Sequence, residues 1–136
     1  MTATTVDRGT QRRDANQFAF PVAAATKIPG GVIVALNASG QAVNGATSTT
    51  LKAVGMSEAL ADNTAGAAGD IKVLVRRGCF KFGNSSAGDL IALADVGSSC
   101  YIVDNQTVAK TNGSSTRSIA GTVRDIDSDG SVWVEF

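Results

Sequence analysis

Hydrophobic and polar residues alternate along several short stretches of this chain, most clearly in residues 17–26, 71–75 and 132–136. A period of two places the apolar side chains on one face of an extended chain, which is the pattern of a half-buried β-strand. Residues 32–36 form a short continuous apolar run followed by turn residues, and this run is expected to pair as a hairpin with a small strand around Ala42 and Val43.

Segments of this kind recur after residue 16 and predict about nine to eleven short strands, at the spacing expected of a barrel or sandwich. Residues 56–61 are compatible with one helical turn, but a strand is favoured. Gly78 interrupts the alternation, and we expect it to mark a bulge at which one long strand bends. The prediction is an all-β fold, a small β-barrel or β-sandwich, with residues 17–136 forming a single β domain.

Residues 1–16 differ from the rest because they are polar and contain only two large apolar side chains. They cannot pack a core of their own, so we predict an extended N-terminal arm. Fully extended, such an arm could span on the order of 50 Å and lie on a neighbouring molecule. A frayed, disordered terminus is the alternative interpretation.

A pattern of three strands occurs twice in the sequence. An apolar strand after glycine (32–36, then 90–94) is followed by a strand containing a small residue and glycine (54–55, then 120–121). An alternating strand closes each copy (71–75, then 132–136). The separation between the copies changes from 58 residues at Gly30 and Gly88 to 66 at Val54 and Ala120. True repeats keep a period, so both a duplication and generic β patterning remain open.

The composition restricts the chemistry that the chain can perform. Twelve Lys and Arg residues balance twelve Asp and Glu residues in a chain of 136, and histidine is absent. No net field draws the protein to nucleic acid or to a membrane. Without histidine there is no Ser-His or Cys-His pair, and no Cys/His cluster has the spacing of a zinc site. We therefore expect no enzymatic activity and no cofactor.

The segment from Asp125 to Gly130 matches the first half of a calcium-binding EF-hand loop. The match fails at the twelfth position, where Phe136 stands in place of the bidentate glutamate. Asp-Gly between two alternating apolar runs is a strong signal for a β-hairpin. We therefore predict a hairpin with an acidic tip and no metal.

The cysteines and the densest basic stretch each have a simple structural interpretation. The N-terminus is polar and unlike a signal peptide, so a reducing compartment is expected and free thiols are favoured for the two cysteines. A disulfide between Cys79 and Cys100 is the alternative. Cys79 is predicted to be a small core residue. The basic side chains around Arg76 and Arg77 are expected to form a solvated strand face, with Phe80 and Phe82 in the core rather than on a nucleic-acid platform.

The order of several short segments carries a resemblance to a known class of protein. The segments are residues 28–31, 54–56, 78–80, 88–89, 101–104, 120–123, 129–130 and 132–134. In this order the chain resembles the small β-rich head proteins of tailed bacteriophages, the decoration or cement proteins (minor capsid proteins) that coat and reinforce the capsid. The resemblance extends over nearly all of the chain after residue 17.

The resemblance implies a structural protein without enzymatic activity that binds the outside of a phage capsid and stabilises the shell by bridging capsid subunits. It implies the major capsid protein as partner, assembly in the host cytoplasm, and a homo-oligomer, with a trimer favoured and a dimer possible. It also implies that a terminal arm reaches across neighbouring subunits. The residues expected at such interfaces are Arg8, Arg12 and Arg13, which would pair with carboxylates, and Phe18 and Phe20, which would anchor the root of the arm.

A different class of function is the alternative. A virion-borne tail or fibre module that binds carbohydrate or a receptor is also compatible with a small β domain. Such a module is expected to expose aromatic side chains along a groove. The chain has one tryptophan and one tyrosine, which offers little for that purpose.

Overall fold

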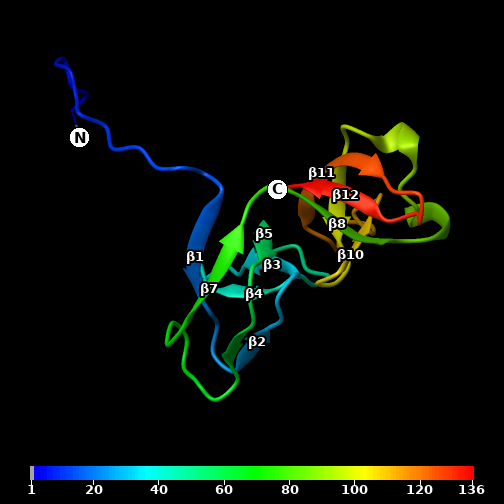
Figure 1. The fold of residues 1–136 in the computed structure, drawn as a ribbon, viewed down its shortest axis with the longest axis horizontal. Helices are drawn as coiled ribbons and strands as arrows, with labels where there is room; N and C mark the ends of the chain where they lie inside the picture. The colour runs from blue at the N-terminus through cyan, green and yellow to red at the C-terminus, as the bar shows by residue number, and fades with distance from the viewer. Residues whose placement is uncertain (1) are drawn as a thin grey trace.

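The computed structural model describes residues 2–136 and has an all-β fold (Figure 1), as the alternation predicts. It has twelve strands in the described part of the chain, more than the nine to eleven expected, because several are only three residues long. Two 3-10 turns, η1 (Ala87–Asp89) and η2 (Leu93–Asp95), complete the regular structure. The strands are β1 (Gln17–Pro21), β2 (Thr26–Ile28), β3 (Ile33–Leu36), β4 (Ala42–Asn44), β5 (Lys52–Ser57), β6 (Ala61–Asn63), β7 (Lys72–Arg76), β8 (Cys79–Asn84), β9 (Ser99–Ile102), β10 (Thr107–Ala109), β11 (Ile119–Ile126) and β12 (Val132–Glu135).

The strands form two units that follow one another along the chain. In the N-terminal half (β1 to β7), a five-stranded sheet has the order β1-β7-β5-β3-β4, and β2 pairs separately with β6. The C-terminal barrel (β8 to β12) has the order β8-β12-β11-β9-β10, and the parallel pair β10-β8 closes it. In the N-terminal half, β1 and β4 are the two edge strands of the sheet, and a parallel bridge between Val22, which follows β1, and Ala42 of β4 connects these edges.

The two units share one topology. Counting the five strands of each sheet along the chain, both have the spatial order first, fifth, fourth, second, third. The registers agree as well, because Val34 of β3 lies opposite Gly55 of β5 and Cys100 of β9 lies opposite Gly121 of β11. Positions 34 and 100, like positions 55 and 121, differ by 66. The N-terminal half and the C-terminal barrel are therefore structural repeats of one another.

The separation between equivalent positions is not constant, because the connections between strands differ in length. Phe20 pairs with Val73 in the N-terminal half, and Phe82 pairs with Val132 in the barrel. These equivalences correspond to separations of 62 and 59 residues. The strands β2 and β6 lie in connections of the N-terminal half and have no counterpart in the barrel. The changing separation seen in the sequence therefore reflects loop length and does not argue against a repeat.

One part of the repeat predicted from sequence is wrong. Residues 90–94 contain no strand, and the counterpart of β3 is β9. The other two correspondences, of β5 with β11 and of β7 with β12, are confirmed by the pairing registers. Apolar residues at 90–94 resemble a strand, but Leu90 and Leu93 are exposed in the connection between β8 and β9.

The two equivalent glycines face the same steric restriction. A Cβ on Gly55 would overlap the carbonyl oxygen of Arg76, and a Cβ on Gly121 would overlap that of Glu135. In both cases a valine Cγ1 also lies only 2.9 Å away. The backbones of neighbouring strands approach too closely at these points for any side chain. This explains why glycine occurs at the same position of the strand in both copies.

Gly78 lies at the junction of the two units and not within one long strand, which corrects the sequence prediction. β7 ends at Arg76 in the N-terminal sheet, and β8 begins at Cys79 in the barrel. Gly78 has φ of +151°, a conformation that residues with a side chain rarely adopt. The change of sheet and not a bulge therefore accounts for the break in the alternation.

β3 holds the two units together. Its central residues are buried, with Ile33 and Ala35 in the hydrophobic cluster of the barrel and Val34 in the cluster of the N-terminal half. Successive side chains of a strand point to opposite faces, so β3 contributes to a core on each side. This explains the continuous apolar run at residues 32–36 and packs the N-terminal half against the barrel.

Polar contacts between loops reinforce this packing. The backbone N–H of Ile33 donates to the carbonyl oxygen of Asn105 at 2.8 Å, and the Asn105 side chain donates to Oδ1 of Asn44 at 3.0 Å. Thr47 donates from Oγ1 to the carbonyl oxygen of Val103 at 2.9 Å. These bonds join the β4 side of the N-terminal half to the β9-β10 turn of the barrel.

We predict that Gly121→Ala destabilises the fold by about 1–3 kcal/mol, because the new methyl group must displace the backbone of β12. Gly88→Ala is the matched control, since nothing lies within 4 Å of a Cβ at that position, and it is expected to change stability by less than about 0.5 kcal/mol. Urea unfolding of both variants measures the difference. Equal midpoints for the two would contradict the close approach of β11 and β12.

Candidate interaction surface

The N-terminal arm extends away from the folded units (Figure 1). Residues 2–15 contain no strand and are exposed. Among the described residues, neither Arg8 nor Arg12 forms an ion pair. Both guanidinium groups are therefore available to a partner.

The root of the arm is held by an aromatic pair. The guanidinium carbon of Arg13 lies 4.4 Å from the centre of the Phe18 ring, and the rings of Phe18 and Phe20 are stacked with centroids 6.3 Å apart. A cation over an aromatic face is attracted by the ring quadrupole, by about 0.5–1 kcal/mol at an exposed site. The structure thus brings together Arg13, Phe18 and Phe20 of the five residues predicted from sequence, and leaves Arg8 and Arg12 farther along the arm.

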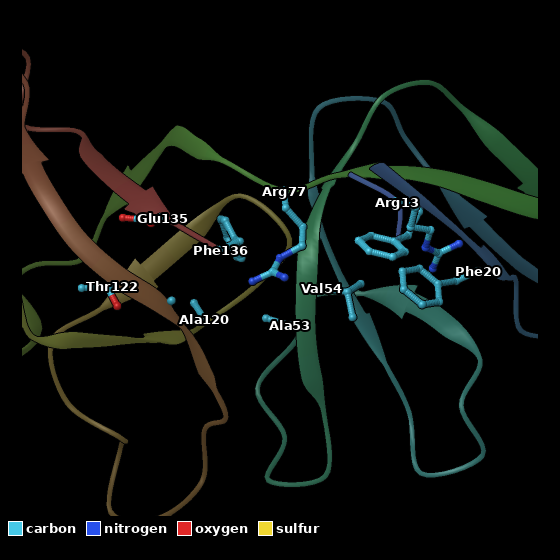
Figure 2. A pocket seen from close by; sticks show the side chains of 11 residues that line it. Arg13, Phe20, Ala53, Val54, Arg77, Ala120, Thr122, Glu135 and Phe136 are labelled. Carbon is cyan, nitrogen blue, oxygen red and sulfur yellow. The ribbon is translucent and has the colours of Figure 1, made fainter. Parts of the chain in front are cut away.

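A cleft of about 650 Å³ opens beside this root, between the N-terminal half and the barrel. Arg13, Phe18 and Phe20 line one side, and Ala120 and Phe136 line the other. Figure 2 shows the Arg77 side chain between Phe136 and Val54. No local sequence pattern indicates the participation of Arg77 or Phe136, because only the packing of the two units places them beside β1.

The positive charges in the cleft have no ion-pair partner within the described residues. Arg13 and Arg77 form no salt bridge, whereas Glu135, the acidic residue of the lining, is paired with Arg124. The neighbouring Arg76 is paired with Glu58. The cleft therefore combines aromatic walls with two guanidinium groups that are free to bind a carboxylate.

Comparison of the chain with models of protein families, with curated proteins and with solved structures found no match.

The remaining basic side chains near Arg77 do not form one patch. Lys81 bonds to the carboxylates of Asp127 and Asp129 at 3.1 and 3.2 Å, and Arg76 points to Glu58. Phe82 is buried in the barrel core. The stretch is therefore divided between ion pairs and core packing, as expected for a strand with one solvated face.

The Asp-rich turn is a hairpin, as predicted. The backbone N–H of Asp127 donates to the carbonyl oxygen of Ser131 at 2.8 Å, and that of Gly130 donates to Asp127 at 2.9 Å. Gly130 has φ of +84°, which the turn requires. The acidic tip is largely compensated, because Lys81 lies between two of its carboxylates.

Both cysteines are free thiols, as predicted, but the placement of Cys79 in the core is wrong. Cys79 is exposed, because Phe80 and Phe82 take the inward positions of β8 and alternation turns Cys79 outward. Partial desolvation and the nearby Glu135 carboxylate raise the pKa of Cys79. Burial raises the pKa of Cys100 to about 11. Neither thiol is activated as a nucleophile.

Exposed apolar side chains also occur outside the cleft. Leu90, Leu93 and Val96 are exposed along the connection between β8 and β9, at the far side of the barrel from the arm (Figure 1). Within residues 2–136, no helix has the length and hydrophobicity that crossing a membrane requires.

We predict that Lys81→Gln raises the pKa of Asp127 more than that of Asp129. Lys81 is the largest cause that lowers the Asp127 pKa, whereas the backbone N–H of Ser131 is the largest cause that lowers the pKa of Asp129 to about 2. Carboxyl-carbon NMR titration of the protein and its variant measures both values. A larger shift for Asp129 would contradict this assignment of causes.

The same groups determine how stability depends on acid. Because the folded-state pKa of Asp129 lies below its ordinary value of 3.8, its contribution is present above that pH and is lost as the pH falls toward 2. Lys81→Gln is expected to weaken the acid dependence of the midpoint of urea unfolding over this range. An unchanged profile would contradict the contribution of Lys81 to the lowered pKa values of Asp127 and Asp129.

Proposed function

We propose that this protein decorates the outside of a tailed-phage capsid and stabilises the shell by bridging subunits of the major capsid protein. The observation that carries the proposal is the exposed, arginine-bearing arm on a compact β unit. The sequence resemblance supports the same class of function. The protein acts as a structural component of the virion, with no enzymatic activity and no cofactor.

The arm is suited to contacts spread over several subunits. Exposed ion pairs such as those open to Arg8 and Arg12 contribute only about 0–1 kcal/mol each. A homo-oligomer, with a trimer favoured, presents several arms at once, and linkage of the arms raises the effective concentration of each after the first has bound. Modest contacts then suffice to hold the protein on the shell.

Removal of residues 2–16 is expected to reduce co-sedimentation of the protein with capsids assembled from the major capsid protein, while circular dichroism keeps its β signature. The reason is that the arm contributes contacts to the shell but none to either hydrophobic cluster. Equal decoration by the truncated and full-length proteins would overturn the role of the arm.

A charge-matched pair of variants distinguishes binding through Arg8 and Arg12 from a non-specific effect of the protein's charge. Arg8→Glu with Arg12→Glu is expected to weaken binding to capsids and to reduce its dependence on salt. Lys52→Glu with Lys72→Glu makes the same change of charge at two exposed strand positions, neither of which forms an ion pair with another described residue. This variant is expected to bind nearly as well as the unmodified protein. Equal losses in the two variants would indicate a non-specific charge effect.

Binding of a carbohydrate or receptor by a tail or fibre module is a second candidate, because the cleft exposes the rings of Phe18, Phe20 and Phe136. An apolar cleft with a few convergent polar groups is a common form of ligand site. A glycan-binding screen, run beside capsid co-sedimentation, distinguishes the two functions. Glycan binding that is lost in Phe20→Ser, without any binding to capsids, would favour the second candidate.

A further inference from the structure

The repeat relationship shows that the N-terminal half lacks a side chain that completes the barrel. The register places Phe18 and Phe20 of β1 at the positions of Phe80 and Phe82 of β8. By the same register, Arg77 occupies the position of Phe136, and each residue follows the last strand of its unit. The backbone N–H of Arg77 donates to the carbonyl oxygen of Asn16 at 2.8 Å, and that of Phe136 donates to the carbonyl oxygen of Gly78 at 2.9 Å. Asn16 and Gly78 each precede the first strand of their unit. An arginine thus replaces an aromatic ring.

The consequence of this replacement is visible in the packing. Phe136 lies edge-to-face with Phe82, with ring centroids 5.7 Å apart, and Phe82 is only 5% exposed. In the N-terminal half the equivalent Phe20 is only half-buried, and Phe18 belongs to neither hydrophobic cluster. The cleft of about 650 Å³ opens at this position (Figure 2). It is large enough for several residues of an extended segment.

The charges of the cleft restrict what can occupy it. Arg13 and Arg77 are unpaired among the described residues, and Glu135 is held by Arg124. An apolar side chain that contacts the exposed rings, followed by a carboxylate, would satisfy both the aromatic and the cationic parts of the lining.

The arm itself carries this combination. Val6 is the one large hydrophobic side chain of residues 2–16, it is 74% exposed, and Asp7 follows it. Within one molecule Arg13, near the root of the arm, lines the cleft. The arm itself extends away from the folded units (Figure 1). A second copy can therefore receive the segment without any reversal of the chain, and an arm of this length can reach it.

We propose that the Val6-Asp7 segment of one copy binds in the cleft of a second copy, with Val6 against the phenylalanine rings and Asp7 at Arg77. Neighbouring side chains of an extended segment point in opposite directions, so the two contacts fall on different sides of the cleft. Exchange of arms in a closed ring of copies produces a symmetric homo-oligomer. The inference rests on the proposed function for the binding role of the arm, but it concerns the protein alone, without capsids.

Light scattering over a range of protein concentrations tests the proposal. Val6→Ser is expected to weaken self-association by about tenfold or more, because an apolar contact is lost. Val96→Ser is the matched control at another exposed valine and is expected to associate normally. Asp7→Arg and Arg77→Asp should each weaken association, and the double variant should restore it. A protein that is monomeric at all concentrations, or association unchanged in Val6→Ser, would overturn the proposal.

Cross-linking between two separately prepared variants shows which copy supplies the segment. Both variants carry Cys79→Ser, which removes the exposed thiol. One also carries Thr5→Cys, which keeps Val6 and Asp7. The other carries Thr122→Cys in the cleft lining and a tag that changes its mass. Oxidation of the mixture is expected to give a mixed disulfide. In the control, the second variant carries Thr49→Cys, at an exposed position outside the cleft lining, in place of Thr122→Cys, and no mixed disulfide is expected. No mixed product above this control would exclude arm exchange.

The two proposals fail in different ways. Loss of capsid binding in a protein that still exchanges arms counts against the decoration function alone. Capsid binding by a protein that stays monomeric and forms no mixed disulfide counts against arm exchange alone.

Discussion

The burial of β3 on both faces is the constraint on which the rest of the structure depends. Ile33 and Ala35 complete the core of the barrel, and Val34 completes that of the N-terminal half. Full burial of each large aliphatic side chain contributes about 1.5–3 kcal/mol, so separating the two units would expose apolar surface on both sides of one strand. The orientation of the two units follows from this strand, and with it the walls of the cleft and the point at which the arm leaves the fold.

The two repeats have the same topology but differ in how completely they close. In the barrel, β10 pairs in parallel with β8, and Phe136 packs on the phenylalanines of β8. In the N-terminal half, a single bridge between Val22 and Ala42 takes the place of that pairing. Arg77 stands where the barrel has Phe136. The cleft is thus located at the position where one repeat departs from the other.

The arrangement joins a rigid support to an extended segment, which suits a structural role. Ordering a chain segment costs conformational entropy, and the contact of Arg13 with Phe18 already orders the root of the arm. The free part of the arm carries both charged and apolar groups, so it can serve contacts with a shell and contacts between copies. The proposed decoration of capsids and the proposed exchange of arms use different residues of this one segment.

The sequence by itself determined the all-β class, the extended arm and the hairpin at residues 127–130, and it favoured free thiols, because each depends on local patterns of alternation, turn residues or composition. It raised the correspondence of Val54-Gly55 with Ala120-Gly121 but left generic β patterning open. The close backbone approach that allows only glycine at both sites is visible in the structure alone. Local pattern could not distinguish residues 90–94 from a strand, because apolar side chains on a loop look the same as those on a strand.

Only the tertiary structure decided the remaining features. The burial of β3 on two sides, the change of sheet at Gly78 and the equivalence of Arg77 with Phe136 depend on strand registers between residues far apart in the chain. Loop lengths vary between the repeats, so no constant sequence separation reveals these registers. The cleft exists because two units pack across one shared strand, and no single segment of the sequence contains that information.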